Sequence, residues 1–133
     1  MNLKDELRVR SKKAIQERAD EEAKRVRRKR EEVLGKAEEL IRALPQKLKL
    51  AADSGSQKLA VMKPERGLHF DGTDTDLMEN YRANGLRDLL KGGAQKVAAF
   101  LLKEGLTVSL EEEPHHDEGQ GRAWTDILLV ASW

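Results

Sequence analysis

The sequence predicts an α+β fold, an α/β sandwich in which a long N-terminal helix is followed by a small three-stranded mixed sheet packed by helices. Three observations favour this class. Residues 3–44 contain no proline and are rich in the helix formers Ala, Glu, Lys, Arg and Leu. Residues 106–111 alternate between apolar and polar side chains, and residues 124–133 are apolar on both faces of an extended chain. The length of 133 residues corresponds to about one domain.

The expected N-terminal helix carries a narrow apolar stripe, whose spacing alternates between four and three residues and is interrupted at Arg30. The stripe consists of Ala19, Ala23, Val26, Val33, Ala37, Leu40 and Leu44. Such a stripe is typical of a helix that packs on one neighbour. A continuous helix would be about 60 Å long, so we expect it either to protrude or to break near Gly35. Pro45 should kink it, with a continuation to about Ala52.

The rest of the chain predicts three strands and two helical stretches. In order, we expect a strand at 57–62, a loop at 64–74, a helix at 76–90 and a second helical stretch at 94–103. These should be followed by a strand at 106–111, a polar loop at 112–122 and a last strand at 124–133. Thr75 is the expected N-cap of the first helix, and Gly105 should close the second. Because the last strand is apolar on both faces, we place it at the centre of the sheet.

Charge is unevenly distributed along the chain, although the net charge is only +1. Residues 1–50 hold 16 basic and 10 acidic side chains, a net of +6, whereas residues 51–133 hold 9 and 14, a net of −5. All five aromatic residues lie in the second part. We therefore predict a basic helical arm at 1–50 and a small acidic α/β domain at 51–133, which should contain the core.

A run of six basic residues in seven is the first candidate binding site. Its members are Lys24, Arg25, Arg27, Arg28, Lys29 and Arg30. Such a run can neutralise the phosphates of DNA or RNA. On a helix, however, seven residues cover almost two turns, so the positive charge surrounds the helix rather than forming one face. The alternatives are a solvated, salt-bridged helix and a surface for a protein partner.

An acidic segment near the expected hairpin loop is the second candidate. Its carboxylates, a candidate partner surface, are Glu111, Glu112, Glu113, Asp117 and Glu118. They can mimic phosphate, although the simpler interpretation is a solvated loop. His115 and His116 lie among them. Adjacent side chains of an extended segment point to opposite faces, so we expect no metal site there.

Several classes of function are not expected. The chain has no cysteine, which excludes disulfides, thiolate zinc sites and thiol catalysis. It has no G-x-S-x-G motif, and residues 91–96 read as a turn before a helix rather than a P-loop, so we expect no enzyme, no catalytic residue and no cofactor. Because no apolar run of about 18 residues and no apolar leader is present, we expect no membrane partner and a cytoplasmic, intracellular location.

Two stretches and the end of the chain resemble small uncharacterised phage and viral α/β proteins. In residues 51–61, a helix ends in A-x-x-G before a strand, and in residues 97–108, a second helix ends in K-E-G before another. The chain closes on Ser132-Trp133. The resemblance covers about the last 85 residues and carries no catalytic residue. The resemblance alone implies no activity, and an accessory or assembly role in a phage or virus is consistent with it.

Together these features predict a non-catalytic protein-interaction or assembly protein that self-associates through its basic helical arm. The arm of one copy can dock on the acidic domain of a second, so the expected partner is another copy or a different protein. One alternative is a protein that binds DNA or RNA through the basic run. Another is a stoichiometric inhibitor that occupies a nucleic-acid-binding protein through its acidic loop.

Overall fold

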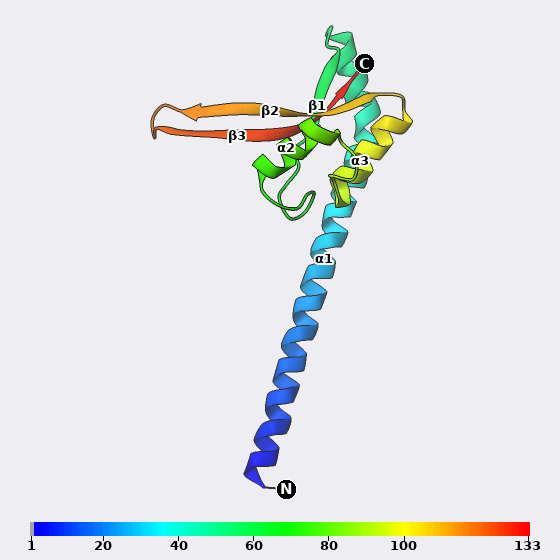
Figure 1. Cartoon of the computed structure of the whole chain (residues 1–133). Helices are drawn as coiled ribbons and strands as arrows, with labels where there is room; N and C mark the ends of the chain where they lie inside the picture. Colours follow the sequence, from blue (N-terminus) through cyan, green and yellow to red (C-terminus); the bar gives the residue numbers. More distant parts are fainter. Residues whose placement is uncertain (1) are drawn as a thin grey trace. The chain divides into compact units, whose positions relative to one another are not determined.

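The computed structural model describes residues 2–133, in which it contains three helices and three strands (Figure 1). In chain order they are α1 (Leu3–Asp53), β1 (Lys58–Met62), α2 (Asp74–Asn84), α3 (Gly92–Lys103), β2 (Thr107–Asp117) and β3 (Arg122–Ser132). The predicted α+β class, with its long N-terminal helix, is therefore confirmed.

Helix α1 continues through both Gly35 and Pro45, so the alternative of a break near the glycine is wrong. The chain forms two compact units, residues 1–32 and 33–133, which we call the N-terminal unit and the C-terminal unit and describe separately. The division that charge suggested after residue 50 does not coincide with this one. The reason is packing, because α1 residues such as Leu44 belong to the core of the C-terminal unit.

The sheet of the C-terminal unit has the order β1-β3-β2, so the last strand is central, as predicted. Both ladders are antiparallel, so the sheet is not mixed as the sequence predicts. The first two strands do run in the same direction, but β3 lies between them and pairs with each. Adjacent Leu129 and Val130 point to opposite faces and are only 0% and 2% exposed, so the centre of β3 is buried on both sides.

The hairpin of β2 and β3 is longer than the sequence predicts. The segment expected to be a loop, 112–122, is paired for most of its length, from Glu112↔Ile127 to Asp117↔Arg122. Only residues 118–121 form the turn. Pro114 fits within β2 because this strand is at an edge of the sheet, where a missing N–H need not break a ladder. β1 pairs only with the C-terminal end of β3, from Lys58↔Ser132 to Met62↔Leu129.

Helix α2 begins two residues earlier than predicted, and Thr73 rather than Thr75 is its N-cap. The Thr73 hydroxyl accepts a hydrogen bond from the Asp76 N–H, and the Asp76 carboxylate accepts one from the Thr73 N–H. This reciprocal capping box satisfies two backbone donors. Three residues after Thr75 stands Met78, which cannot reciprocate.

The core of the C-terminal unit joins the later part of α1 to the short helices and the sheet. Its largest fully buried side chains are Phe70, Leu44, Leu101, Leu129, Val97 and Val130. Two partly exposed charges connect α3 with α1, where Lys96 Nζ lies 3.7 Å from Glu38 Oε1. The apolar stripe of α1 thus packs on a neighbour in this unit, as its spacing predicts.

Candidate interaction surface

The N-terminal unit is one helical segment whose described residues, 2–32, are all exposed. It carries the first three residues of the apolar stripe, preceded by Ile15 four positions earlier. We call these four residues, Ile15, Ala19, Ala23 and Val26, the exposed stripe. Ile15 is 67% and Val26 40% exposed. Further along the same stripe, in the C-terminal unit, Ala37 is 6% and Leu44 0% exposed. One spacing pattern is therefore buried in one unit and solvent-exposed in the other.

Apolar side chains in this unit are not confined to the exposed stripe. Leu3 and Leu7 are 68% and 54% exposed, and together with Ile15 they line a shallow surface near the start of the helix. Val9 is also exposed, at 57%. Single exposed apolar residues are ordinary, but several on one helix are typical of a surface that contacts something else.

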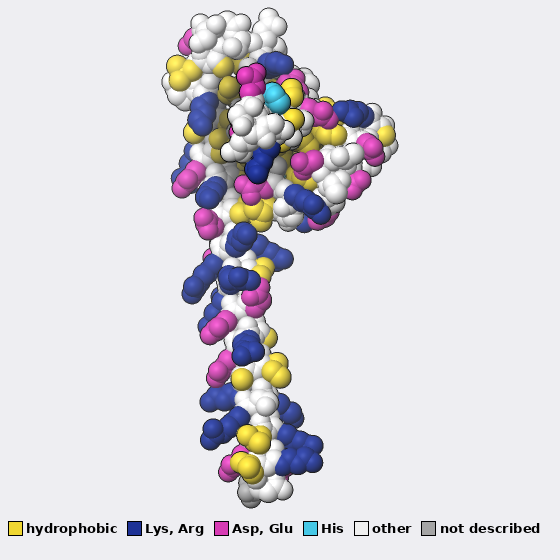
Figure 2. Space-filling model, turned by 90° about the vertical axis from the view of Figure 1, so that its left-hand side faces the viewer, with side chains coloured by type: hydrophobic (Ala, Val, Ile, Leu, Met, Phe, Trp, Pro, Cys, Tyr) yellow, Lys and Arg dark blue, Asp and Glu magenta, His cyan; other side chains and the backbone are white. Residues whose placement is uncertain are grey.

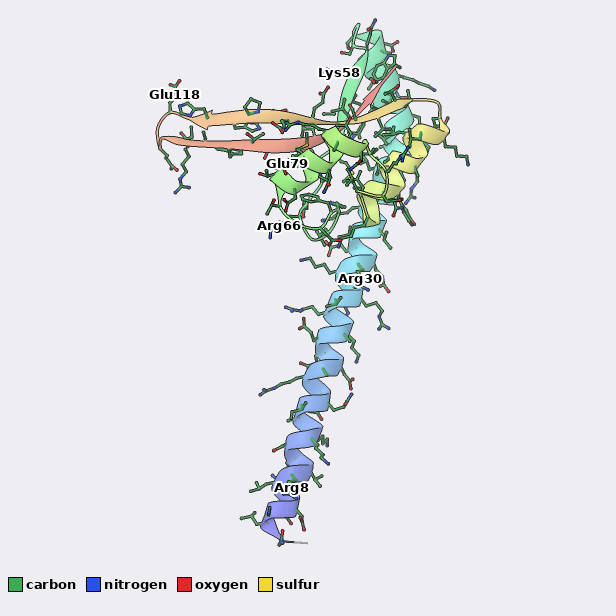
Figure 3. All side chains as sticks on the ribbon, viewed as in Figure 1. Arg8, Arg30, Lys58, Arg66, Glu79 and Glu118 are labelled. Carbon is green, nitrogen blue, oxygen red and sulfur yellow. The ribbon has the colours of Figure 1, made fainter. Side chains whose placement is uncertain are left out.

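The six basic residues of the run 24–30 are all exposed. Lys and Arg side chains cover much of this helix, with apolar side chains between them (Figure 2). They project from more than one side, as the sticks between the labelled Arg8 and Arg30 show (Figure 3). Arg25 Nη2 lies 2.6 Å from Glu22 Oε1. Both side chains are more than half exposed, so this pair contributes at most about 1 kcal/mol.

The structure divides the acidic candidate residues between the two faces of β2. Glu111 pairs with Lys58 at 3.1 Å, and Glu113 approaches His115 Nε2 at 2.9 Å. Glu112 points the other way and pairs with Arg82 of α2 at 2.6 Å. The last two candidates stand at the end of the hairpin, where Asp117 accepts a hydrogen bond from the Gly119 N–H and Glu118 is in the turn (Figure 3). These five carboxylates therefore do not form one continuous patch.

His115 lies in a cluster that the sequence did not predict. Its ring stacks on Trp124, its partner across the ladder, with centroids 5.3 Å apart and planes at 16°. Its Nε2 is buried and lies 2.9 Å from Glu113 Oε1 and 3.0 Å from Asp126 Oδ2, without a well-aligned hydrogen bond. Lys63 also pairs with Asp126 at 2.7 Å. The hydrogen bond from Lys63, its charge and the contact with His115 lower the pKa of the Asp126 carboxyl.

This cluster assembles because antiparallel register brings Glu113, His115, Trp124 and Asp126 to one face. His116 is on the opposite face of the strand, as expected from alternation. Within residues 2–133, no group of three or more His, Asp or Glu side chains is arranged to hold a metal ion. The cluster could have been predicted only from the pairing of β2 with β3, and that pairing cannot be inferred while residues 112–122 are taken as a loop.

The Lys91-Gly92-Gly93 segment forms the start of α3, with Lys91 as the N-cap residue. Lys91 Nζ pairs with Asp71 at 2.6 Å. A Cβ on buried Gly93 would lie 3.1 Å from the Cβ of Ala37, so the glycine lets α3 approach α1 closely. The two glycines thus have a structural explanation in the turn and in this packing.

His69 is the one buried residue with an ionisable side chain in the described part of the chain, at 7% exposure. Its Nδ1 accepts a hydrogen bond from the Glu65 N–H at 2.9 Å, and its carbonyl accepts one from the Lys91 N–H. Accepting through Nδ1 requires the neutral ring. Burial lowers the pKa of His69 below its ordinary value of 6.5, with a smaller opposing effect of Glu65.

His69 should therefore make folding pH-dependent. The unfolded chain takes up a proton at this residue near pH 6.5, whereas the folded chain does so only at lower pH. The stability from neutral His69 is thus complete above about pH 6.5 and is lost as the pH falls below it. We expect the free energy of unfolding, measured with urea, to fall more between about pH 7.5 and about pH 5.5 in the wild type than in His69→Asn. The asparagine keeps a hydrogen-bond acceptor but does not titrate. Equal losses in both proteins would contradict this assignment.

Comparison of the chain with protein-family models, curated proteins and solved structures found no match. No helix within residues 2–133 combines the length and apolar character needed to cross a membrane. The arrangement of the described side chains is therefore the basis for a functional inference.

Proposed function

We propose that this chain is a non-catalytic interaction protein that self-associates through the helix of its N-terminal unit. The observation that carries the proposal is the exposed stripe, because the same spacing buries Ala37 and Leu44 elsewhere on the same helix. Burying one Val or Ile side chain contributes about 1.5–3 kcal/mol. Burial of such a stripe against another helix is therefore favourable.

Two further observations support this proposal. Helical stability in proteins comes mostly from packing of an apolar stripe rather than from intrinsic propensity. Because residues 2–32 are all exposed in a single copy, packing on a second copy would stabilise this helix. Acidic and basic residues also alternate in blocks along this helix, which allows complementary pairing between copies. An accessory or assembly role in a phage or virus is compatible with such a protein.

Val26→Lys should weaken self-association, because it places a charge within the exposed stripe. The matched control is Val9→Lys, at an exposed valine outside the stripe. Light scattering with mass determination across protein concentration should give a mass above the monomer for the wild type. We expect association of Val26→Lys to be about tenfold weaker or more, with Val9→Lys close to wild type. A strict monomer at both low and high salt would overturn the proposal.

The second candidate function is binding of DNA or RNA through the basic run, favoured by the exposure of all six of its basic side chains. Anisotropy titration with a labelled duplex separates it from self-association. Each phosphate contact should contribute a slope of about −0.9 in log K against log salt. Absence of binding at about 50 mM salt would exclude this candidate.

A further inference from the structure

We propose that two copies bind through their N-terminal units in antiparallel orientation, with residues 17–32 of the two helices side by side. In this register Ala23 of each copy lies opposite Val26 of the other, and Ala19 opposite Arg30. The inference rests on the proposed function and specifies it, since it names the surface of the second copy, the orientation and the register.

Arg30, which interrupts the apolar stripe, determines the orientation. In a parallel two-fold pair, each residue of the stripe lies opposite the same residue of the other chain, so two Arg30 side chains would share one layer of the interface. In the antiparallel register, Arg30 lies opposite Ala19 instead. The small alanine leaves room for the aliphatic part of the arginine, while the guanidinium reaches solvent beside the interface. The interruption thus disfavours the parallel pair and is accommodated in the antiparallel one.

The charges beside the stripe are complementary in the same register. Helical spacing places Asp20 and Arg27 on one flank of the stripe, and Glu22 and Lys29 on the other. In an antiparallel pair, each flank meets the same flank of the second copy. Asp20 therefore faces Arg27, Glu22 faces Lys29, and two-fold symmetry repeats both contacts. All four contacts between the copies join opposite charges.

The single copy holds these carboxylates only weakly. Glu22 pairs with Arg25 at 2.6 Å, and Asp20 accepts a hydrogen bond from Gln16 at 3.0 Å. Both contacts are exposed, so they can be exchanged for contacts with a second copy at little cost. The association should therefore weaken as salt is added.

The acidic surface of the C-terminal unit offers the basic helix opposite charge, but that charge is already partly paired. Glu111, Glu112 and Asp126 pair with Lys58, Arg82 and Lys63 at 3.1, 2.6 and 2.7 Å. The first two pairs are exposed, like that of Glu22, so charge by itself does not favour one surface over the other. A second N-terminal unit instead offers an unfilled apolar stripe together with opposite charge.

Single-cysteine variants test the orientation directly, because the natural chain contains no cysteine. Ala19→Cys and Arg30→Cys chains of different tag length are mixed in full-length form and oxidised. The antiparallel register predicts a mixed disulfide dimer of the two variants. In a pair of two Ala19→Cys chains, the thiols would be offset by eleven positions, or about 16 Å along the helix, which is too far for a disulfide. Arg28→Cys is the matched control, since it is at a similar height on the opposite side of the helix.

We expect the Ala19→Cys and Arg30→Cys mixture to give at least about tenfold more mixed dimer than Ala19→Cys with Arg28→Cys. If each variant instead formed disulfide dimers predominantly with itself, the proposal would be overturned in favour of a parallel pair. Absence of both products in a chain that light scattering shows to be oligomeric would overturn it in favour of another surface, such as helix-on-domain docking. A monomeric chain would instead remove the proposed function itself, so the two failures are distinguishable.

Discussion

Leu44→Ala should lower the free energy of unfolding of the C-terminal unit by about 2–5 kcal/mol. Leu44 is 0% exposed and belongs to the same apolar cluster as Leu101 and Leu129. Truncation removes buried methyl groups and leaves a cavity that helix and sheet can only partly fill. Since a domain is stable by only about 5–15 kcal/mol, this is a large fraction of the total.

Urea denaturation followed by tryptophan fluorescence measures this effect, because both tryptophans are in the C-terminal unit. The matched control is Leu50→Ala in the same helix, where the side chain is 56% exposed. We expect this control to change stability by no more than about 0.5 kcal/mol. Similar losses for the two variants would show that α1 is not packed on the core at Leu44.

Gly92→Ala should lower the free energy of unfolding by about 1–3 kcal/mol. Gly92 has a φ of +59°, which residues with a Cβ rarely adopt, and its added Cβ would lie 2.9 Å from the carbonyl oxygen of Leu68. The neighbouring atom belongs to the backbone, so it cannot move aside as a side chain would. The start of α3 or the preceding loop must shift.

Gly35→Ala is the natural comparison, because the same chemical change should act in the opposite direction. Gly35 lies inside α1, and a Cβ there would meet nothing within 4 Å. Alanine in a helix interior is favoured over glycine by about 0.5–1 kcal/mol. Thermal or urea unfolding of the two variants should therefore give changes of opposite sign. A stabilising effect of Gly92→Ala would contradict the observed backbone conformation.

Much of the fold could be predicted from local patterns. The helix-forming composition and apolar spacing predicted α1 and the face that packs in the C-terminal unit. Alternation predicted the start of β2, and the apolar faces of β3 predicted its central position, which Leu129 and Val130 confirm. These features depend on periodicity within one segment, which a single sequence displays.

Other features could not be predicted because they depend on partners distant in sequence. Residues 112–117 are polar, and β propensity depends strongly on the neighbouring strand, so only the ladder with β3 makes them a strand. The start of α2 differs from these cases. Thr73 and Asp76 have the spacing of a reciprocal cap, a signal that is present in the sequence, whereas the prediction names only Thr75.

In the candidate interaction surface, three features follow from the order of residues alone: the basic run, the charge blocks and the apolar stripe of α1 with its interruption at Arg30. The part of the stripe that packs on the core begins at Ala37, and the part up to Val26 is exposed; this division depends on tertiary packing. Spacing specifies which side chains share a helix face, whereas burial depends on what the rest of the chain can bring against that face. Packing of the strands also divided the acidic segment between two faces of β2 and paired three of its carboxylates with Lys58, Arg82 and His115.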